Sequence, residues 1–288
     1  MPRIVIAGCG FVGLAAARVF HAAGWEVLGL THSAGSAEAL RAEPFSVAPC
    51  DISNAEAVRA VASSLSGKAD AVIHCASSGR GGADAYRAVY LEGARNLLNA
   101  FAPARLIFTS STSVYAQTNG VIVTEESAAE PPRETGQILR EAEDIVLARG
   151  GIAARLAGIY GPGRSVLLRK FFSGSALIEG DGGRVVNQVH RDDIASALPL
   201  LIEKSAAGIF NVSDDTPIPQ REIYAWLAQR FARPLPPSGP IDPDRKRGWT
   251  SKRVNNAKLR ALGWVPQFPS FFDAIERQPE LVKLACEN

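Results

Sequence analysis

Residues 4–13 of this 288-residue chain read Ile4-Val5-Ile6-Ala7-Gly8-Cys9-Gly10-Phe11-Val12-Gly13. The apolar start predicts a strand, and helical spacing of apolar residues over Val12–Ala23 predicts a helix directly after the glycines. A glycine turn between a strand and a helix is typical of a dinucleotide-binding βαβ unit, and this context disfavours a merely flexible loop. Gly8 permits the tight turn, Gly10 lets the backbone approach a pyrophosphate, and Gly13 lets the helix pack closely. Together with the free N–H groups at Phe11 and Val12, they predict an NAD(H) or NADP(H) site.

The first two-thirds of the chain alternates short β-branched runs with longer helical patterns. The expected strands are Ile4–Ala7, Glu26–Leu30, Phe45–Ala48, Ala71–Cys75, Arg105–Thr109 and Ile152–Leu156. The expected helices between them are Val12–Ala23, Asn54–Leu65, Asp84–Ala102 and Thr135–Arg149, each apolar on one face. This alternation predicts an α/β fold of the Rossmann type, a doubly wound parallel sheet covered by crossover helices.

The pattern loosens after Gly161-Pro162-Gly163. The expected elements there are a helix at Asp192–Glu203, a strand at Ile209–Val212, and helices near Gln220–Phe231 and Asn255–Leu262. The proline-rich stretch Pro234–Pro243 is expected to be an extended loop. We therefore divide the chain into a nucleotide-binding domain at residues 1–160, with segments near 185–212 interleaved, and a smaller C-terminal lobe at 161–288, mainly for substrate binding.

Charge and composition exclude several classes of protein. The chain has 31 Lys and Arg against 29 Asp and Glu, a net charge of +2. Such a small net charge does not draw a protein onto nucleic acid or an anionic membrane, so neither is expected as a partner. Without a hydrophobic leader or a long apolar run, the chain is expected to be cytoplasmic. The four cysteines lack metal-type spacing, so no metal site is expected.

The end of the second expected strand bears on the choice of cofactor. The residues there are Thr31-His32-Ser33, where an NAD-specific site usually places a carboxylate against the ribose 2′-hydroxyl. Hydroxyls and an imidazole can donate hydrogen bonds to a 2′-phosphate, so NADP is favoured and NAD stays possible. The alternative is that these residues form only a polar turn.

Several segments, in order, resemble the extended short-chain dehydrogenase/reductase superfamily, in particular its NAD-dependent epimerase/dehydratase group. The matching segments are Cys50-Asp51-Ile52, Val72–Ser77, Phe108–Tyr115, Arg155–Arg164 and Val189–Ile194. The closing segments Phe210–Asp214 and Asn256–Trp264 most resemble a small atypical branch around bacterial YeeZ-like proteins. The resemblance implies that Asp51 and Ile52 contact adenine and that Ala76 and Ser77 pass beside the cofactor. Gly158, in the Arg155–Arg164 segment, is also assigned to the cofactor site.

Hydride-transferring members of this superfamily use a tyrosine with a lysine four residues later. None of the five tyrosines of this chain, Tyr86, Tyr90, Tyr115, Tyr160 and Tyr224, has a lysine at that spacing. Aligning the helix Thr135–Arg149 on the family places Thr135 at the tyrosine position and Leu139 at the lysine position. The usual proton relay is therefore absent, or it is rebuilt from other residues.

The resemblance supplies four candidates for the reaction itself. Ser111 matches the serine that hydrogen-bonds the substrate oxygen, and its alternative is a strand-end hydroxyl bonded to backbone. Tyr115 is the nearest replacement acid, although in the family a tyrosine there lines the substrate pocket. Arg164 and His190 lie in motifs that face the substrate lobe, where they could bind a polar or anionic group. Alternatively, Arg164 is a solvated loop charge and His190 a structural histidine.

Two functions of different classes follow. The first is an NAD(P)-dependent oxidoreductase or epimerase-like enzyme that acts on a small polar or sugar-like hydroxyl or carbonyl compound, with Ser111 polarising the reacting oxygen. The second is a noncatalytic NADP(H)-binding sensor or regulatory protein, which would need neither tyrosine nor lysine. We favour the enzyme. In the family the helices matching Asp84–Ala102 and Thr135–Arg149 form a dimer bundle, so a homodimer is also expected.

Overall fold

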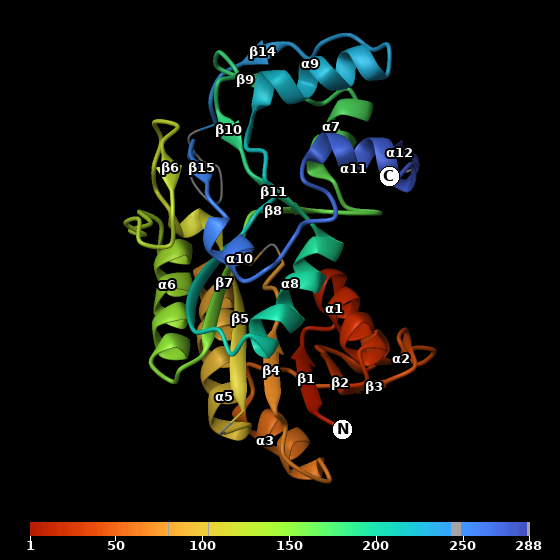
Figure 1. Cartoon of the computed structure of the whole chain (residues 1–288), viewed down its shortest axis with the longest axis vertical. Coiled ribbons are helices and arrows are strands. Elements are labelled where there is room, and N and C mark those ends of the chain that lie inside the picture. The colour runs from red at the N-terminus through yellow and green to blue at the C-terminus, as the bar shows by residue number, and fades with distance from the viewer. Residues whose placement is uncertain (80, 103, 243–248, 287–288) are drawn as a thin grey trace.

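The computed structural model describes residues 1–79, 81–102, 104–242 and 249–286. Its centre is a parallel sheet of seven strands in the order β12-β7-β5-β4-β1-β2-β3 (Figure 1). The strands are β1 (Arg3–Ala7), β2 (Glu26–Thr31), β3 (Ser46–Pro49), β4 (Ala71–His74), β5 (Arg105–Ser111), β7 (Ile152–Leu156) and β12 (Gly208–Val212). This arrangement confirms the predicted doubly wound α/β fold. The expected strands are present, with ends that differ by at most two residues.

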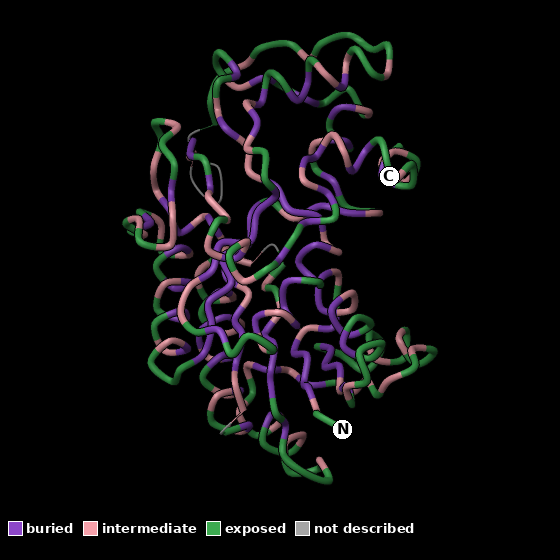
Figure 2. Tube along the Cα trace, in the orientation of Figure 1, coloured by how far each residue is buried: buried purple, intermediate pink, exposed green. Residues whose placement is uncertain are grey.

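Both faces of the sheet are covered, which explains why its strands are apolar at consecutive positions. In β1, Ile4 and Ile6 pack into the core shared with α1 (Phe11–Ala22) and α8 (Arg191–Glu203). Val5 and Ala7 point to the opposite core, shared with α3 (Ala55–Ser64), α5 (Gly93–Ala100) and α6 (Glu134–Leu147). Each fully buried aliphatic side chain contributes about 1.5–3 kcal/mol. Figure 2 shows buried residues along the central strands and exposed residues on the outer turns of the helices.

One expected helix, Asp84–Ala102, is broken into three parts. The structure has α4 (Ala83–Tyr86), a π-helical segment at Arg87–Glu92, and then α5, which ends at Ala100. The wider π turn brings the carbonyl of Val89 to His74, whose Nε2 donates to it at 2.9 Å. Burial lowers the pKa of His74 to about 4, so the imidazole is neutral and one ring nitrogen can donate. Such turns occur frequently at functional sites.

The smaller lobe lies above the carboxyl ends of the sheet strands and has its own apolar core (Figure 1). Its elements are β8 (Gly158–Tyr160), α7 (Val166–Phe172), β9 (Ile178–Glu179), β10 (Val185–Val186), β11 (Gln188–His190), β13 (Ile218–Pro219), α9 (Gln220–Arg230), β14 (Ser238–Gly239), α11 (Phe271–Arg277) and α12 (Glu280–Cys286). The remaining elements are α2 (Ala34–Glu38), a 3-10 turn at Thr112–Val114, β6 (Ile122–Val123), β15 (Arg253–Val254) and α10 (Ala257–Ala261). The chain returns from this lobe to add β12 at the edge of the main sheet. The domain boundary near residue 160 stays a prediction.

The expectation that Pro234–Pro243 is an extended loop throughout is wrong at its centre, where β14 pairs with β9. A proline lacks the N–H that a strand donates, but its carbonyl still accepts. Accordingly, the N–H of Ile178 donates to the carbonyl of Pro237 at 2.9 Å, and the N–H of Gly180 donates to that of Gly239 at 2.8 Å. Pro243 lies outside the described residues.

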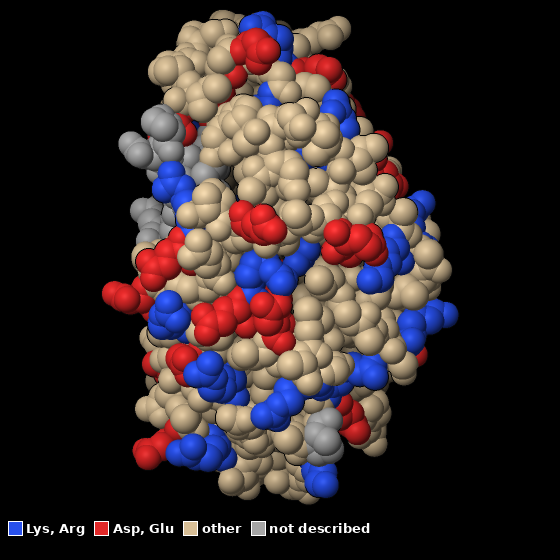
Figure 3. Space-filling view, turned by 90° about the vertical axis from the view of Figure 1, so that its left-hand side faces the viewer, with Lys and Arg blue, Asp and Glu red and all other residues tan. Residues whose placement is uncertain are grey.

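Two surface properties bear on possible partners. No helix in the described part of the chain is both long and apolar enough to cross a membrane. On the face shown in Figure 3, basic and acidic side chains are interspersed rather than gathered into one large area of a single sign. This distribution agrees with the net charge of +2.

Candidate functional site

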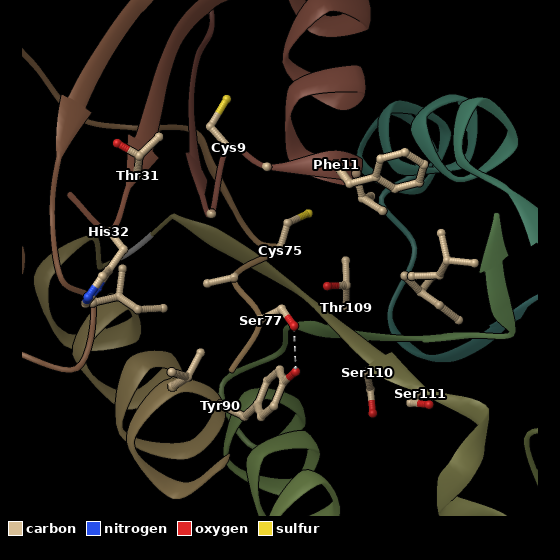
Figure 4. Close-up of a pocket in the computed structure, with 18 of the residues that line it drawn as sticks. Cys9, Phe11, Thr31, His32, Cys75, Ser77, Tyr90, Thr109, Ser110 and Ser111 are labelled. Atoms are coloured by element: carbon tan, nitrogen blue, oxygen red, sulfur yellow. Dashed lines mark hydrogen bonds between the residues drawn. The ribbon is translucent and has the colours of Figure 1, made fainter. Parts of the chain in front are cut away.

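A cavity of about 410 Å³ lies at the carboxyl ends of the central strands (Figure 4). In doubly wound sheets ligands bind at this edge, where the strand order reverses on either side of β1. The expected cofactor residues that line it are Gly8, Gly10, Phe11, Val12, Thr31, His32, Asp51, Ile52, Ala76, Ser77 and Ser111. Three others, Gly13, Ser33 and Gly158, are not in its wall. These segments, distant in sequence, form one continuous surface.

The glycine turn is shaped for a pyrophosphate. Gly8 has a φ of +90°, and a Cβ there would be 2.2 Å from the backbone nitrogen of Ala76. A Cβ on Gly13 would be 2.2 Å from the carbonyl oxygen of Gly8, so only glycine lets α1 approach this closely. Gly10 also lines the cavity, and a Cβ there would meet nothing within 4 Å. No side chain caps the N-terminus of α1, so its first N–H groups are available to phosphate oxygens.

The wall next to the ends of β2 and β3 suits the adenosine half of a dinucleotide. Thr31 Oγ1 donates to the carbonyl of Ser33 at 3.2 Å, and Ser33 Oγ accepts from the N–H of Ser36, capping α2. Ser36 lines the cavity although the sequence did not single it out, because its place depends on this cap. His32 Nδ1 lies 3.8 Å from a carboxylate oxygen of Asp51. The structure therefore brings one carboxylate near the end of β2, from the segment that follows β3.

The opposite end of the cavity holds the candidates for the reaction. Ser111 ends β5, and its Oγ accepts from the N–H of Ser113 at 3.2 Å. Tyr90, on the π turn, donates to Ser77 Oγ at 3.4 Å, and both residues line the cavity (Figure 4). Arg164 also lines the cavity, with its guanidinium carbon 5.2 Å from the centre of the ring of Phe11, the first residue of α1. The sequence pattern did not reveal Tyr90, since its position depends on the π turn.

A buried ion pair between Glu143 and Arg155 lies next to Ser110 in the wall of this end. Ser110 lines the cavity and donates to Glu143 Oε1 at 2.5 Å. Arg155 donates to the same carboxylate through Nε and Nη2, and Arg140 also binds it. Glu143 and Arg155 are fully buried, so their mutual hydrogen bonds offset the cost of removing two charges from water. The network holds β5 and β7 against α6.

The two residues expected from the sequence at the family's tyrosine and lysine positions line adjoining cavities. Leu139, at the lysine position, lines the large cavity. Thr135, at the tyrosine position, lines a smaller cavity of about 120 Å³, and Leu139 is part of that wall as well. The aliphatic side chain of Leu139 is therefore shared by the walls of the two cavities.

Tyr115 and His190 are placed differently from Ser111 and Arg164, since neither lines either cavity. Tyr115 is fully buried, and its hydroxyl donates to Asn211 Oδ1 at 2.8 Å. Burial raises the pKa of the Tyr115 phenol. His190 is also fully buried; its Nδ1 accepts from the N–H of Asp192, and its Nε2 contacts Gln278. Burial lowers the pKa of His190, which favours the neutral ring.

Three thiols, those of Cys9, Cys50 and Cys75, line the large cavity. Burial raises the pKa of Cys9 to about 11 and that of Cys75 to about 12. Both therefore stay protonated near neutral pH, and the thiol is a poor nucleophile compared with the thiolate. They act as small apolar packing groups around the glycine turn. Within the described residues, no cluster of three or more potential metal ligands is found.

Comparison with known proteins supports the family resemblance found in the sequence. Residues 4–213 match the model of the NAD dependent epimerase/dehydratase family. Protein YeeZ of Escherichia coli K12 is 30% identical over 288 aligned positions, which cover 93% of this chain and 97% of that protein. A 3-diazoavenalumate denitrifying reductase of a Streptomyces species is 30% identical over 213 positions, covering 65% of this chain and 70% of that protein.

The fold also matches solved structures. The dTDP-glucose 4,6-dehydratase of Bacillus anthracis, solved in complex with NAD, superposes with a TM-score of 0.83. The superposition covers 100% of this chain and 97% of that one at 16% identity. At that identity the likeness establishes the fold alone.

Proposed function

The chain belongs to the NAD-dependent epimerase/dehydratase family, and on that premise we propose that it is an NADP(H)-preferring oxidoreductase with an atypical proton-transfer site. Its substrate is a small polar or sugar-like compound with a reacting hydroxyl or carbonyl group. The observation that carries the proposal is the uninterrupted wall from the glycine turn to Ser111 and Arg164, ending in hydroxyl groups rather than in a purely apolar surface.

The cavity fits a dinucleotide in each of its parts. The open side of Gly10 and the uncapped start of α1 would hold the pyrophosphate, and Ile52 would contact the adenine. The nicotinamide would lie beside Ser111 and Leu139, where it supplies or accepts a hydride when bound. Ser111 is positioned to hydrogen-bond the substrate oxygen, and the guanidinium of Arg164 to bind a polar or anionic group.

The preference for NADP(H) rests on the end of β2. His32 and Ser36 line the cavity at the end of β2, where an acidic residue would repel a 2′-phosphate. Asp51 also lines the cavity, with one carboxylate oxygen 3.8 Å from Nδ1 of His32, so the imidazole is a basic group close to its charge.

An oxidoreductase agrees with the name of one relative, a denitrifying reductase. The alternative, a noncatalytic dinucleotide sensor, draws on the aliphatic Leu139 at the lysine position. We favour the enzyme because the wall of the cavity includes the polar side chains of Ser111, Tyr90 and Arg164.

The test has two stages. Fluorescence titration of the purified protein with NADPH and NADH is expected to give the lower dissociation constant for NADPH. NADPH oxidation is then followed with a panel of aliphatic and aromatic aldehydes, ketones and nucleotide-linked hexoses. Turnover of any member supports the enzyme, whereas tight binding with no turnover across the panel favours the sensor. Tighter binding of NADH would contradict the cofactor preference.

A further inference from the structure

The smaller cavity next to the proposed nicotinamide position is rich in hydroxyl groups. Its wall includes Thr118, Thr135 and Thr250, and it adjoins the large cavity at Leu139. A second link is the ring of Tyr86, which lines the smaller cavity and packs edge-on against Tyr90 of the large one, with ring centres 4.9 Å apart. A substrate bound beside the nicotinamide could therefore extend one oxygen into this space.

A buried lysine from the C-terminal third of the chain contacts Thr250 in the wall of the smaller cavity. Lys252 is only 4% exposed, and its Nζ donates to the carbonyl of Tyr115 at 2.8 Å and to Thr250 Oγ1 at 3.0 Å. Its position is set by the strand pairing of β15 with β6, which Figure 1 shows above the start of α6. Asn187 ties down the same segment, donating to the carbonyl of Lys252 and accepting from the N–H of Val254.

The direction of these hydrogen bonds determines what Thr250 can do. A lysine ammonium only donates, so the hydroxyl oxygen of Thr250 accepts from it. The hydrogen of that hydroxyl is then left for another acceptor, and Thr250 lines the smaller cavity. Burial, with the nearby charge of Arg184, lowers the pKa of Lys252 to about 8. Lys252 can therefore release and regain a proton near neutral pH, which an ordinary lysine does rarely.

We propose that Thr250 and Lys252 are the proton-donating pair of the active site, with Thr250 contacting the substrate oxygen and Lys252 restoring its proton. This inference rests on the proposed function. It supplies a hydroxyl and an ammonium from a segment unrelated to the helix that carries Thr135 and Leu139. Thr250 is the catalytic residue of the pair, and Lys252 acts through it.

In the direction of reduction, a bound reduced dinucleotide would supply a hydride, so that the C–H bond lost at C4 of its nicotinamide would be replaced by a C–H bond at the substrate carbonyl carbon. The π electron pair moves onto the carbonyl oxygen, which takes the proton of Thr250 Oγ1. Thr250 takes a proton from Lys252 Nζ, which becomes a neutral amine and is reprotonated from solvent. The products are the alcohol and the oxidised dinucleotide.

Tyr115 does not serve this role in the described structure. Its hydroxyl points to Asn211, and it is its backbone carbonyl that contacts Lys252. A purely structural role for Lys252, as an anchor of its segment on Tyr115, is the competing explanation. Lys258 offers a matched control, since its Nζ also donates to a backbone carbonyl, that of Ile209, at 2.9 Å.

The kinetic experiment compares T250V, T250S, K252M and K258M with the wild type, using a substrate identified in the carbonyl panel. T250V is expected to lower kcat by about 100-fold or more, the usual contribution of a general acid, without changing the NADPH dissociation constant. T250S is expected to restore most of the rate. The wild-type reduction rate should fall as pH rises through about 8, because Lys252 loses its proton. K252M should be slow at every pH and should not show this fall near pH 8. K258M should retain the wild-type profile.

A second measurement does not depend on turnover. NMR titration of ¹³C-labelled lysine side chains, with the Lys252 signal assigned by its absence from K252M, should show a pKa near 8. T250V should lower it further, because the ammonium loses an acceptor. An unchanged kcat in T250V overturns the proposal. If the wild type binds NADPH without turnover, the proposed function fails. In that case the pair is also overturned if the pKa of Lys252 is that of an ordinary lysine, or if it is the same in T250V as in the wild type.

Discussion

The two ends of the large cavity are built in different ways. The pyrophosphate end is a single local segment, the turn from Gly8 to Gly13, whose close contacts are with the adjoining strands. The proposed reactive end combines β5, the π turn and α6, and its neighbouring cavity adds Thr250. A short motif is sufficient for the first end, whereas the chemistry of the second depends on residues brought together from four parts of the chain.

Removing the buried carboxylate behind the reactive end should have the largest effect on stability. Glu143→Leu leaves the guanidinium of Arg155 buried without its partner, which costs about 3–5 kcal/mol. Urea denaturation followed by circular dichroism measures this loss. Glu141→Gln is the control, because Glu141 is exposed and its ion pair with Arg87 is long, at 3.7 Å. Equal stability of the two variants would show that the buried network does not support this end.

Lys252 should make the stability of the fold depend on pH. Its pKa is about 8 in the folded protein against 10.5 in a free side chain, so the folded state disfavours the charged form. The free energy of unfolding should therefore be reduced below pH 8 and rise between pH 8 and 10.5, by roughly 3 kcal/mol at most. Arg184 is the other charged group that acts on it.

The measurement is the difference in unfolding free energy between wild type and K252M across this pH range. Titrations that the two proteins share cancel in that difference. A difference that stays flat from pH 8 to 10.5 would contradict a buried, charged Lys252.

Two glycines of the same turn should respond in opposite ways. Gly10→Val puts a side chain into the open cavity, so NADPH affinity should fall about 100-fold while the melting temperature stays close to wild type. Gly13→Val should instead lower the melting temperature, because its Cβ meets the carbonyl oxygen of Gly8. Fluorescence titration and thermal denaturation separate the two results. Loss of stability in Gly10→Val would mean that its side chain does not face the cavity.

The smallest expected effect concerns the choice of cofactor. His32→Glu places a carboxylate at the end of β2, where it would accept from a ribose 2′-hydroxyl and repel a 2′-phosphate. The ratio of the NADH to NADPH dissociation constants should shift by about tenfold toward NADH. His32→Gln, which adds no charge, is the matched control. An unaltered ratio in His32→Glu would place the 2′-position away from this residue.

Most of the nucleotide-binding fold could be predicted from sequence because its signals are local. Apolar periodicity located the central strands, and the order of glycines located the turn, within a few residues. The helix expected at Asp84–Ala102 contains the π turn that places Tyr90 in the cavity, and periodicity does not distinguish π from α geometry over one turn. Tyr115 could not be placed because its sequence position, four residues after Ser111, says nothing about burial against Arg155 and Asn211.

The sequence alone determined that the chain forms a parallel sheet with a glycine turn at Gly8, Gly10 and Gly13 after its first strand, since neighbouring residues carry that information. Only the tertiary structure decided which distant residues meet near the proposed reaction site. Lys252 reaches the carbonyl of Tyr115 across 137 positions of sequence, and no periodic pattern links two such residues. Their contact exists because β15 pairs with β6, and burial in that pairing also gives the ammonium its lowered pKa.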